Sequence, residues 1–182
     1  MHETDFPNYS LHFKGPRFRN PTALAESPLP LRRVLFIGSC FAGAIQESCR
    51  CPSDFVLFNG GVMPPAPRSA AEYDFQIVQI PLRILLHDDD LWHLDYHQTE
   101  AFDHELAKAT DRLTVFLAQF LQFHESTGLP AFVMNFLVPT QNPNGKLFPF
   151  FDVRNIQFFV LQLNMALERL CRQRPFCNVL DV

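Results

Sequence analysis

The chain has 182 residues, a formal net charge of −4, 47% hydrophobic residues and 19% charged residues. This length is enough for one α/β domain with a sizeable core, and the composition is that of a globular chain. The basic residues are scattered apart from Arg32-Arg33 and the run 169–174, which argues against a nucleic-acid partner. No apolar run approaches the ~20 residues that cross a bilayer, so we expect no membrane partner.

The amino terminus lacks the basic and apolar regions of a signal peptide. We therefore expect a cytoplasmic protein whose 5 cysteines are reduced thiols rather than a disulfide framework. Residues 1–31 are rich in Pro, Asn and Arg without periodicity, which predicts an irregular lead-in to a domain over 32–182. The 20 phenylalanines predict an aromatic core, with an apolar or acyl-binding pocket as the alternative.

Strand and helix patterns alternate along the rest of the chain. We expect a first strand at 34–37 and a helix at 40–49, then strands at 55–58 and 75–80, a helical turn at 82–86, a long helix at 99–124, a strand at 131–138, a helix from the N-cap Asp152 to 173 and a last strand at 177–182. The long helix is marked by an apolar stripe at three- and four-residue spacing and ends at the C-cap Gly128. Such alternation predicts a three-layer, doubly wound parallel sheet of five strands, in the flavodoxin-like order 2-1-3-4-5.

The segment Val34–Ala42 contains the main candidate site. Ser39 follows the first strand, so its hydroxyl lies at the carboxyl end of the sheet, where open α/β sheets bind ligands. The helix that follows can aim backbone N–H groups at an anion, although Ser39 could equally serve as its N-cap. Cys40 is a possible thiol nucleophile near that helix terminus; the alternative is a small buried residue packed under the sheet.

The residues Gly38-Ser39-Cys40-Phe41-Ala42, placed between a first strand and a helix, resemble the first block of the SGNH (GDSL-type) hydrolase superfamily and the signature of its GSCFA branch. At the level of fold, the resemblance covers roughly residues 33–182. It implies that Ser39 is the nucleophile and that Gly60 or Gly61, after the second strand, donates an oxyanion N–H.

Two later blocks of that family differ here. Where the family has Gly-x-Asn-Asp, the chain has Gln79–Arg83, so the asparagine donor is missing. Arg83 falls near its place, where it could bind a carboxylate, phosphate or oxyanion, or simply face solvent. The Asp-x-x-His block belongs after the fifth strand, in which the chain ends at Val182. A serine needs a base within reach, so we expect a continuation beyond Val182, a histidine from elsewhere in the chain, or no such catalysis.

A second resemblance concerns segments 73–78, 81–83, 91–92, 135–139 and 178–182, which are similar to the amino-terminal SGNH-like region of FkbH-type proteins. In that family the region precedes a haloacid-dehalogenase-type domain that handles a phosphorylated three-carbon acid and an acyl carrier. The resemblance implies that this chain is the front part of a biosynthetic protein.

Two patterns contain metal-type ligands. Cys49-Arg50-Cys51 has one intervening residue and no second cysteine pair, which is not the spacing of a zinc ribbon. His93 and His97 are four apart, but without the glutamate of His-Glu-x-x-His. We expect incidental thiols and a solvated loop, with divalent-cation binding as the alternative, and therefore predict neither a metal nor a cofactor.

Together these observations predict an ester hydrolase or acyltransferase with Ser39 as nucleophile. Its oxyanion site would use the Ser39 N–H and Gly60 or Gly61, and its substrate would be a small-molecule acyl ester or a carrier-bound acyl group. The alternative is a non-catalytic domain that binds a carrier or ligand through the same cleft, within a larger biosynthetic enzyme. The oligomeric state is not predicted.

Overall fold

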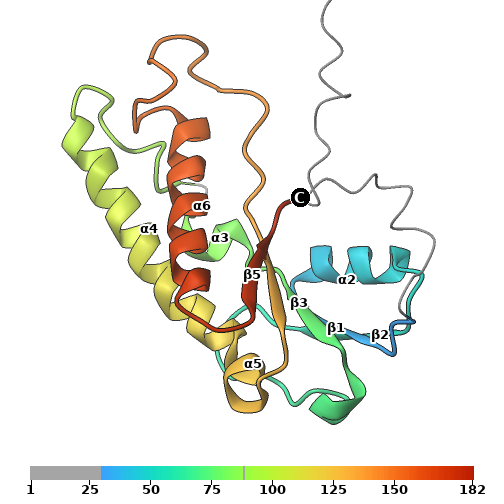
Figure 1. Cartoon of the computed structure of the whole chain (residues 1–182). Helices are drawn as coiled ribbons and strands as arrows, with labels where there is room; N and C mark the ends of the chain where they lie inside the picture. The colour runs from blue at the N-terminus through green and yellow to red at the C-terminus, as the bar shows by residue number, and fades with distance from the viewer. Residues whose placement is uncertain (1–29, 88) are drawn as a thin grey trace, which may run out of the picture. The chain divides into compact units, whose positions relative to one another are not determined.

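Five parallel strands form one sheet in the order β2-β1-β3-β4-β5 (Figure 1). The structure is a computed structural model that describes residues 30–87 and 89–182, so nearly all of the expected lead-in lies outside the described residues. The strands are β1 (Val34–Gly38), β2 (Ser53–Leu57), β3 (Phe75–Val78), β4 (Ala131–Met134) and β5 (Cys177–Leu180). The predicted strand order is confirmed.

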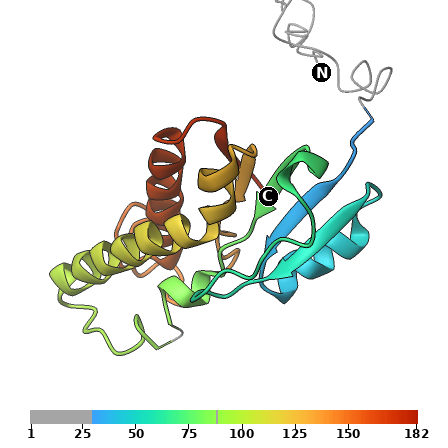
Figure 2. The same ribbon diagram turned by 90° about the horizontal axis from the view of Figure 1, so that it is seen from below.

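Helices cover both faces of the sheet. They are α2 (Cys40–Ser48), α3 (Leu82–Leu85), α4 (Thr99–Phe120), α5 (Gln122–Thr127) and α6 (Ile156–Arg172), with a short 3-10 helix, η2 (Ala70–Glu72). Figures 1 and 2 show α2 on one side of the sheet, against β1 and β2, and α4 and α6 on the other. The predicted three-layer α/β architecture is therefore confirmed. Among the described residues, no helix is long and apolar enough to cross a membrane.

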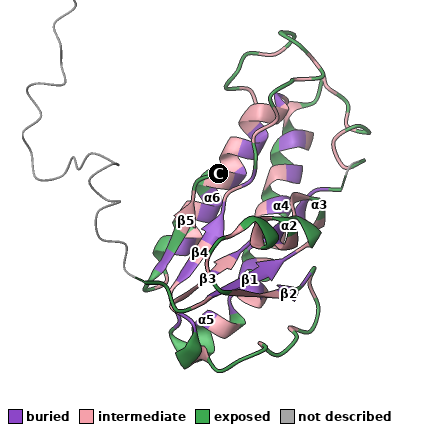
Figure 3. Cartoon of the chain, turned by 90° about the vertical axis from the view of Figure 1, so that its right-hand side faces the viewer, coloured by how far each residue is buried: buried purple, intermediate pink, exposed green. Residues whose placement is uncertain are grey.

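The main core lies between the sheet and the layer formed by α4 and α6. Figure 3 shows buried residues along the central strands and on the inner sides of these two helices. Leu35 and Ile37 of β1 belong to this core, and Phe58 packs edge-on against Phe120 of α4 at a centroid distance of 4.6 Å. The predicted aromatic core is confirmed by the buried phenylalanines Phe36, Phe58, Phe102, Phe120, Phe136 and Phe159.

The prediction of one helix over 99–124 is wrong, because the structure divides it at Leu121. Leu121 has φ −95° and ψ 7°, and it separates α4 from α5. Phe120 and Leu121 are both fully buried, and the local change in direction lets two consecutive side chains enter the core. The predicted C-cap is confirmed, since Gly128 is left-handed with φ 73° and donates its N–H to the His124 carbonyl at 2.8 Å.

The last helix starts later than the sequence predicts. Its N-cap is Asn155, whose side-chain oxygen accepts the N–H of Gln157 at 3.0 Å, and not Asp152. The Asp152 carboxylate is instead bound to the Arg154 side chain, with 2.6 Å between Oδ2 and Nη2. The third and fourth strands also end earlier than predicted, at Val78 and Met134. This early end of β3 leaves Gln79 just beyond the strand rather than within it.

Candidate functional site

Ser39 and Gln79 meet at the point where the chain changes direction across the sheet. Strands β1 and β3 are neighbours, but the chain leaves β1 toward β2 and leaves β3 toward β4, on the opposite side. Ser39 directly follows β1 and Gln79 directly follows β3. In open α/β sheets this switch point is where loops separate and ligands bind.

The Ser39 side chain makes two hydrogen bonds in a half-buried position. Its Oγ accepts the N–H of Phe41 at 3.3 Å, which confirms the N-cap interpretation. Its hydroxyl donates to Oε1 of Gln79 at 2.7 Å, and the Ser39 backbone N–H donates to the same oxygen at 3.1 Å. The backbone donor expected to bind an oxyanion therefore faces a carboxamide oxygen.

Gly38 makes this close approach possible. A Cβ at position 38 would lie 2.7 Å from the backbone oxygen of Gln79 and 2.9 Å from the Cβ of Ala42. The backbone just after β3 and the first turn of α2 therefore occupy the space that a side chain at position 38 would need. The absence of a Cβ at Gly38 allows Ser39 to lie within reach of Gln79.

The glycine turn after β2 is confirmed, but it faces α4. Gly60 and Gly61 have φ values of 105° and 96°, in the range that favours glycine. A Cβ at Gly60 would lie 2.8 Å from the ring of Phe116, and the Gly61 N–H donates to Oε1 of Gln119 at 3.4 Å. Both neighbours belong to α4, so the structure does not direct the Gly61 N–H toward Ser39.

Cys40 and Arg83 occupy exposed positions on different helices. Cys40 is the first residue of α2 and its thiol is free. The alternative of a small buried residue under the sheet is therefore wrong for Cys40, because its position at the helix start turns it toward solvent. Arg83 is the second residue of α3 and contributes to the wall of a cavity.

Neither hydrogen-bond partner of the Ser39 side chain in the described part of the chain is a base. One is the carboxamide of Gln79 and the other is a backbone N–H. The histidines at 87, 93, 97 and 104 are exposed. His124 is buried on α5, where its Nδ1 is 2.7 Å from the carbonyl oxygen of Leu129. None of these histidines is a hydrogen-bond partner of the Ser39 side chain, so none of them serves as its general base in this structure.

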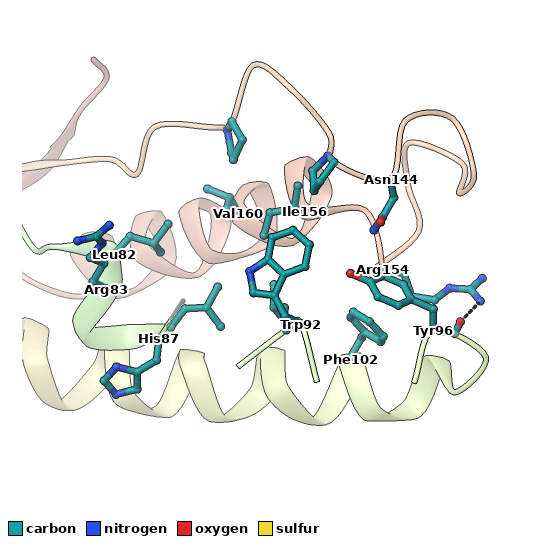
Figure 4. A pocket seen from close by; sticks show the side chains of 14 residues that line it. Leu82, Arg83, His87, Trp92, Tyr96, Phe102, Asn144, Arg154, Ile156 and Val160 are labelled. Atoms are coloured by element: carbon teal, nitrogen blue, oxygen red, sulfur yellow. Dashed lines mark hydrogen bonds between the residues drawn. The ribbon is translucent and has the colours of Figure 1, made fainter. Parts of the chain in front are cut away.

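A cavity of about 490 Å³ opens at the same end of the sheet, between α3, α4 and α6 (Figure 4). Its wall is mostly apolar and includes Leu82, Leu86, Trp92, Phe102, Ile156 and Val160. Because Leu82 is three residues after Gln79, their Cα atoms are at most about 11 Å apart. The cavity wall thus begins close to the Ser39–Gln79 contact.

Arg154 joins two of the segments that border this cavity. Its guanidinium donates to the backbone oxygen of Tyr96 at 2.9 Å, shown dashed in Figure 4, and to both carboxylate oxygens of Asp152. It also lies 4.3 Å from the ring centroid of Phe148. The hydrogen bond from Arg154 lowers the pKa of Asp152 below its usual value. The charge of Arg154 is thus compensated within the wall.

Comparison with known proteins adds no family to these observations. No protein-family model matches the sequence, and no curated protein is significantly similar to it. The resemblance to SGNH hydrolases therefore remains a prediction from the residues around Ser39. Within residues 30–87 and 89–182, no group of three or more His, Cys, Asp or Glu side chains is placed to hold a metal ion.

The contact between Gln79 and Ser39 and the location of the cavity are the two features of this site that the sequence did not reveal. The apolar run 75–80 predicts that Gln79 lies inside a strand, and the missing asparagine donor makes Arg83 the candidate instead. The only signal available was a polar residue at the end of an apolar run, directly before Ile80-Pro81. The phenylalanine content offers an apolar pocket only as an alternative, and it does not locate one, because the walls of the cavity come from segments more than 70 positions apart, such as Leu82 and Ile156.

Proposed function

We propose that this chain performs acyl-ester chemistry, hydrolysis or transfer, with Ser39 as the nucleophile. The observation that carries the proposal is the position of the Ser39 hydroxyl, half-buried at the switch point of the sheet and oriented by Gln79 at 2.7 Å. The substrate is a small-molecule acyl ester or a carrier-bound acyl group. No metal or cofactor is needed for this reaction.

In the proposed reaction, Ser39 Oγ attacks the carbonyl carbon of the ester and its proton passes to a base. The leaving alkoxide takes that proton, and water or an acceptor alcohol then attacks the acyl-serine and regenerates Ser39. The negative oxygen of the intermediate would displace Gln79 Oε1 from the Ser39 N–H, which is 3.1 Å away. The Gln79 carboxamide also carries a donor, Nε2, which makes it a second candidate for the oxyanion site besides Gly60 or Gly61.

The reaction requires a base that is not in contact with Ser39 in the described part of the chain. A carboxamide oxygen cannot take the serine proton at neutral pH, because it is only a hydrogen-bond acceptor. The proposal therefore requires a base that comes within hydrogen-bond reach of Ser39 Oγ when substrate binds, and it is tested on the whole protein.

A second candidate function is the binding of a carrier or ligand without catalysis, as part of a larger biosynthetic enzyme. The specific observation in its favour is that both partners of the Ser39 side chain, Gln79 and the Phe41 N–H, satisfy the hydroxyl without activating it. For both functions we propose a cytoplasmic location, because all 5 cysteines are free thiols; cell fractionation tests this.

The two functions are separated by ester hydrolysis. We expect the full-length protein to hydrolyse p-nitrophenyl esters, and Ser39→Ala to reduce kcat at least about 1000-fold while the protein stays folded. Ser48→Ala, on the exposed end of the same helix, is the matched control and should retain full activity. Hydrolysis that persists in Ser39→Ala would refute Ser39 as nucleophile, and a complete lack of hydrolysis in the wild type would favour the binding function.

A further inference from the structure

The cavity between α3, α4 and α6 has the size and lining of a site for an apolar chain. We propose that it binds a single-chain amphiphile, with an alkyl or acyl chain of about 8 to 12 carbons inside and the polar end in water at the open mouth. The inference rests on the proposed function in one respect: the acyl chain of an ester substrate is one of the two kinds of chain, alkyl and acyl, that would occupy the cavity. Binding itself does not require Ser39 to react.

The volume sets the length of the chain. At about 30 Å³ per non-hydrogen atom, which is the share of a water molecule in the liquid, 490 Å³ has room for roughly 16 atoms. A bound ligand does not fill the whole volume of its cavity, and cavities of 300–1,000 Å³ commonly hold small organic molecules. A chain of about 8 to 12 carbons leaves space for imperfect packing.

The lining favours an apolar chain over a polar ligand. Ile156 and Val160 of α6 face the cavity from one side, and Phe102 of α4 and Leu86 line it from other elements (Figure 4). Burying one methylene group contributes about 0.8 kcal/mol, which corresponds to about fourfold in affinity. Affinity should therefore rise about fourfold per added carbon until the cavity is full.

The charges at the wall do not require an anionic ligand. Arg154, the cation at one side of the cavity, is bound through Nε and Nη2 to both carboxylate oxygens of Asp152. Arg83 also lines the cavity, so the head group of a fatty acid lies among charged groups, whereas a fatty alcohol carries no charge. A fatty alcohol should therefore bind through its chain, and it measures the contribution of the apolar wall alone.

The protein contains its own reporter for this site. Trp92 is the only tryptophan of the chain, lines the cavity and is 59% exposed. A chain that enters the mouth covers its indole ring. We expect a saturable blue shift of tryptophan emission when the full-length protein is titrated with decan-1-ol or with decanoate, below the concentrations at which they self-associate. Hexan-1-ol should bind roughly 200-fold more weakly than decan-1-ol, from four methylenes at about fourfold each.

Cavity-filling variants test the location. Ile156→Phe and Leu82→Phe each add three carbon atoms to the wall, so each should weaken decan-1-ol binding at least about tenfold. Val115→Phe places the same ring on the exposed side of α4 and should leave binding unchanged. Thermal unfolding identifies any variant that fails to fold; two independent filling positions keep the test decisive.

Three results would overturn the proposal: no saturable shift with decan-1-ol, equal affinity in the folded filling variants, or binding of decanoate without binding of decan-1-ol. Ser39→Ala separates this inference from the proposed function. If decan-1-ol binds Ser39→Ala and wild type equally and the wild type hydrolyses no ester, the proposed chemistry fails and the cavity site stands. If Ser39 hydrolyses esters but no shift occurs, the cavity site fails alone.

Discussion

The hydroxyl and the backbone N–H of Ser39 both donate to one oxygen, Oε1 of Gln79, at 2.7 and 3.1 Å. The two residues directly follow neighbouring strands, β1 and β3, from which the chain departs in opposite directions. Gly38 permits the contact, because a Cβ there would collide with the Gln79 backbone. Gln79 therefore sets the orientation of the one hydroxyl on which the proposed chemistry depends.

Replacing Gln79 should affect stability and reactivity together. Gln79→Leu leaves the half-buried Ser39 N–H without its acceptor, so we expect the free energy of unfolding to fall by about 1 to 2 kcal/mol. The serine hydroxyl also loses its fixed orientation, and ester hydrolysis should slow at least about tenfold. Gln122→Leu is the control, because Gln122 is exposed on α5 and is not a hydrogen-bond partner of Ser39. Urea unfolding and steady-state kinetics provide both measurements; wild-type hydrolysis by folded Gln79→Leu would contradict the assigned role.

The Asp152–Arg154 pair should contribute stability that is lost in acid. The hydrogen bond from Arg154 lowers the pKa of Asp152 in the folded state below its usual 3.8. A carboxyl group with a lowered folded-state pKa stabilises the fold above its unfolded-state pKa, and loses this contribution as the pH falls through the folded-state value. Wild type should therefore be more stable than Asp152→Asn at neutral pH, and the difference should shrink as the pH falls below 3.8. Urea unfolding across pH checks this, and a difference that stays constant into strong acid would contradict it.

Tyr73 should ionise unusually late. Burial and a 2.9 Å hydrogen bond from its hydroxyl to Asp54 raise its pKa from the usual 10.0 to about 12. Because the neutral form is favoured in the folded state, its contribution to stability is complete below pH 10 and is lost as the pH rises through about 12. The ultraviolet titration of the 3 tyrosines should thus contain one late component that Tyr73→Phe removes. A single transition near pH 10 for all three would disprove this.

The two glycines after β2 should differ in their tolerance of alanine. Both have positive φ, so either substitution should cost about 1 to 2 kcal/mol through backbone strain. Gly60→Ala should cost at least about 1 kcal/mol more, because its Cβ would meet the Phe116 ring at 2.8 Å while Gly61 has open space. Adding Phe116→Leu should recover that difference in a double-mutant cycle. Equal costs at the two positions would show that the Phe116 contact does not matter.

The fold was predictable where local patterns and topology rules agree. The apolar run 34–37 and the alternation of strands with helices predicted the strand order, because parallel neighbours and right-handed crossovers leave few alternatives. Boundaries were less predictable. Asp152 and Asn155 are both good N-caps by residue type, and the choice depends on Arg154, which binds Asp152. The division of the long helix at Leu121 follows from tertiary packing that no periodicity records.

The sequence predicts the position of Ser39 and the glycine turn, but not the residues that contact them. Ser39 follows a strand and a glycine, which is a local signal, and its N-cap role was among the expectations. Its partner Gln79 is 40 residues away, and a single glutamine at the end of an apolar run carries no pattern of its own. Gly60 and Gly61 were correctly expected in a turn, but the direction of the Gly61 N–H toward Gln119 depends on how α4 packs.

The most direct test of Ser39 as a nucleophile is covalent labelling of the folded, full-length protein with a fluorophosphonate, followed by mass spectrometry of its peptides. The account predicts one adduct, on the peptide that contains Ser39, that is retained in Ser48→Ala and absent both from Ser39→Ala and from protein unfolded before labelling. A folded protein with no adduct on Ser39, or with its adduct on another residue, would contradict the account.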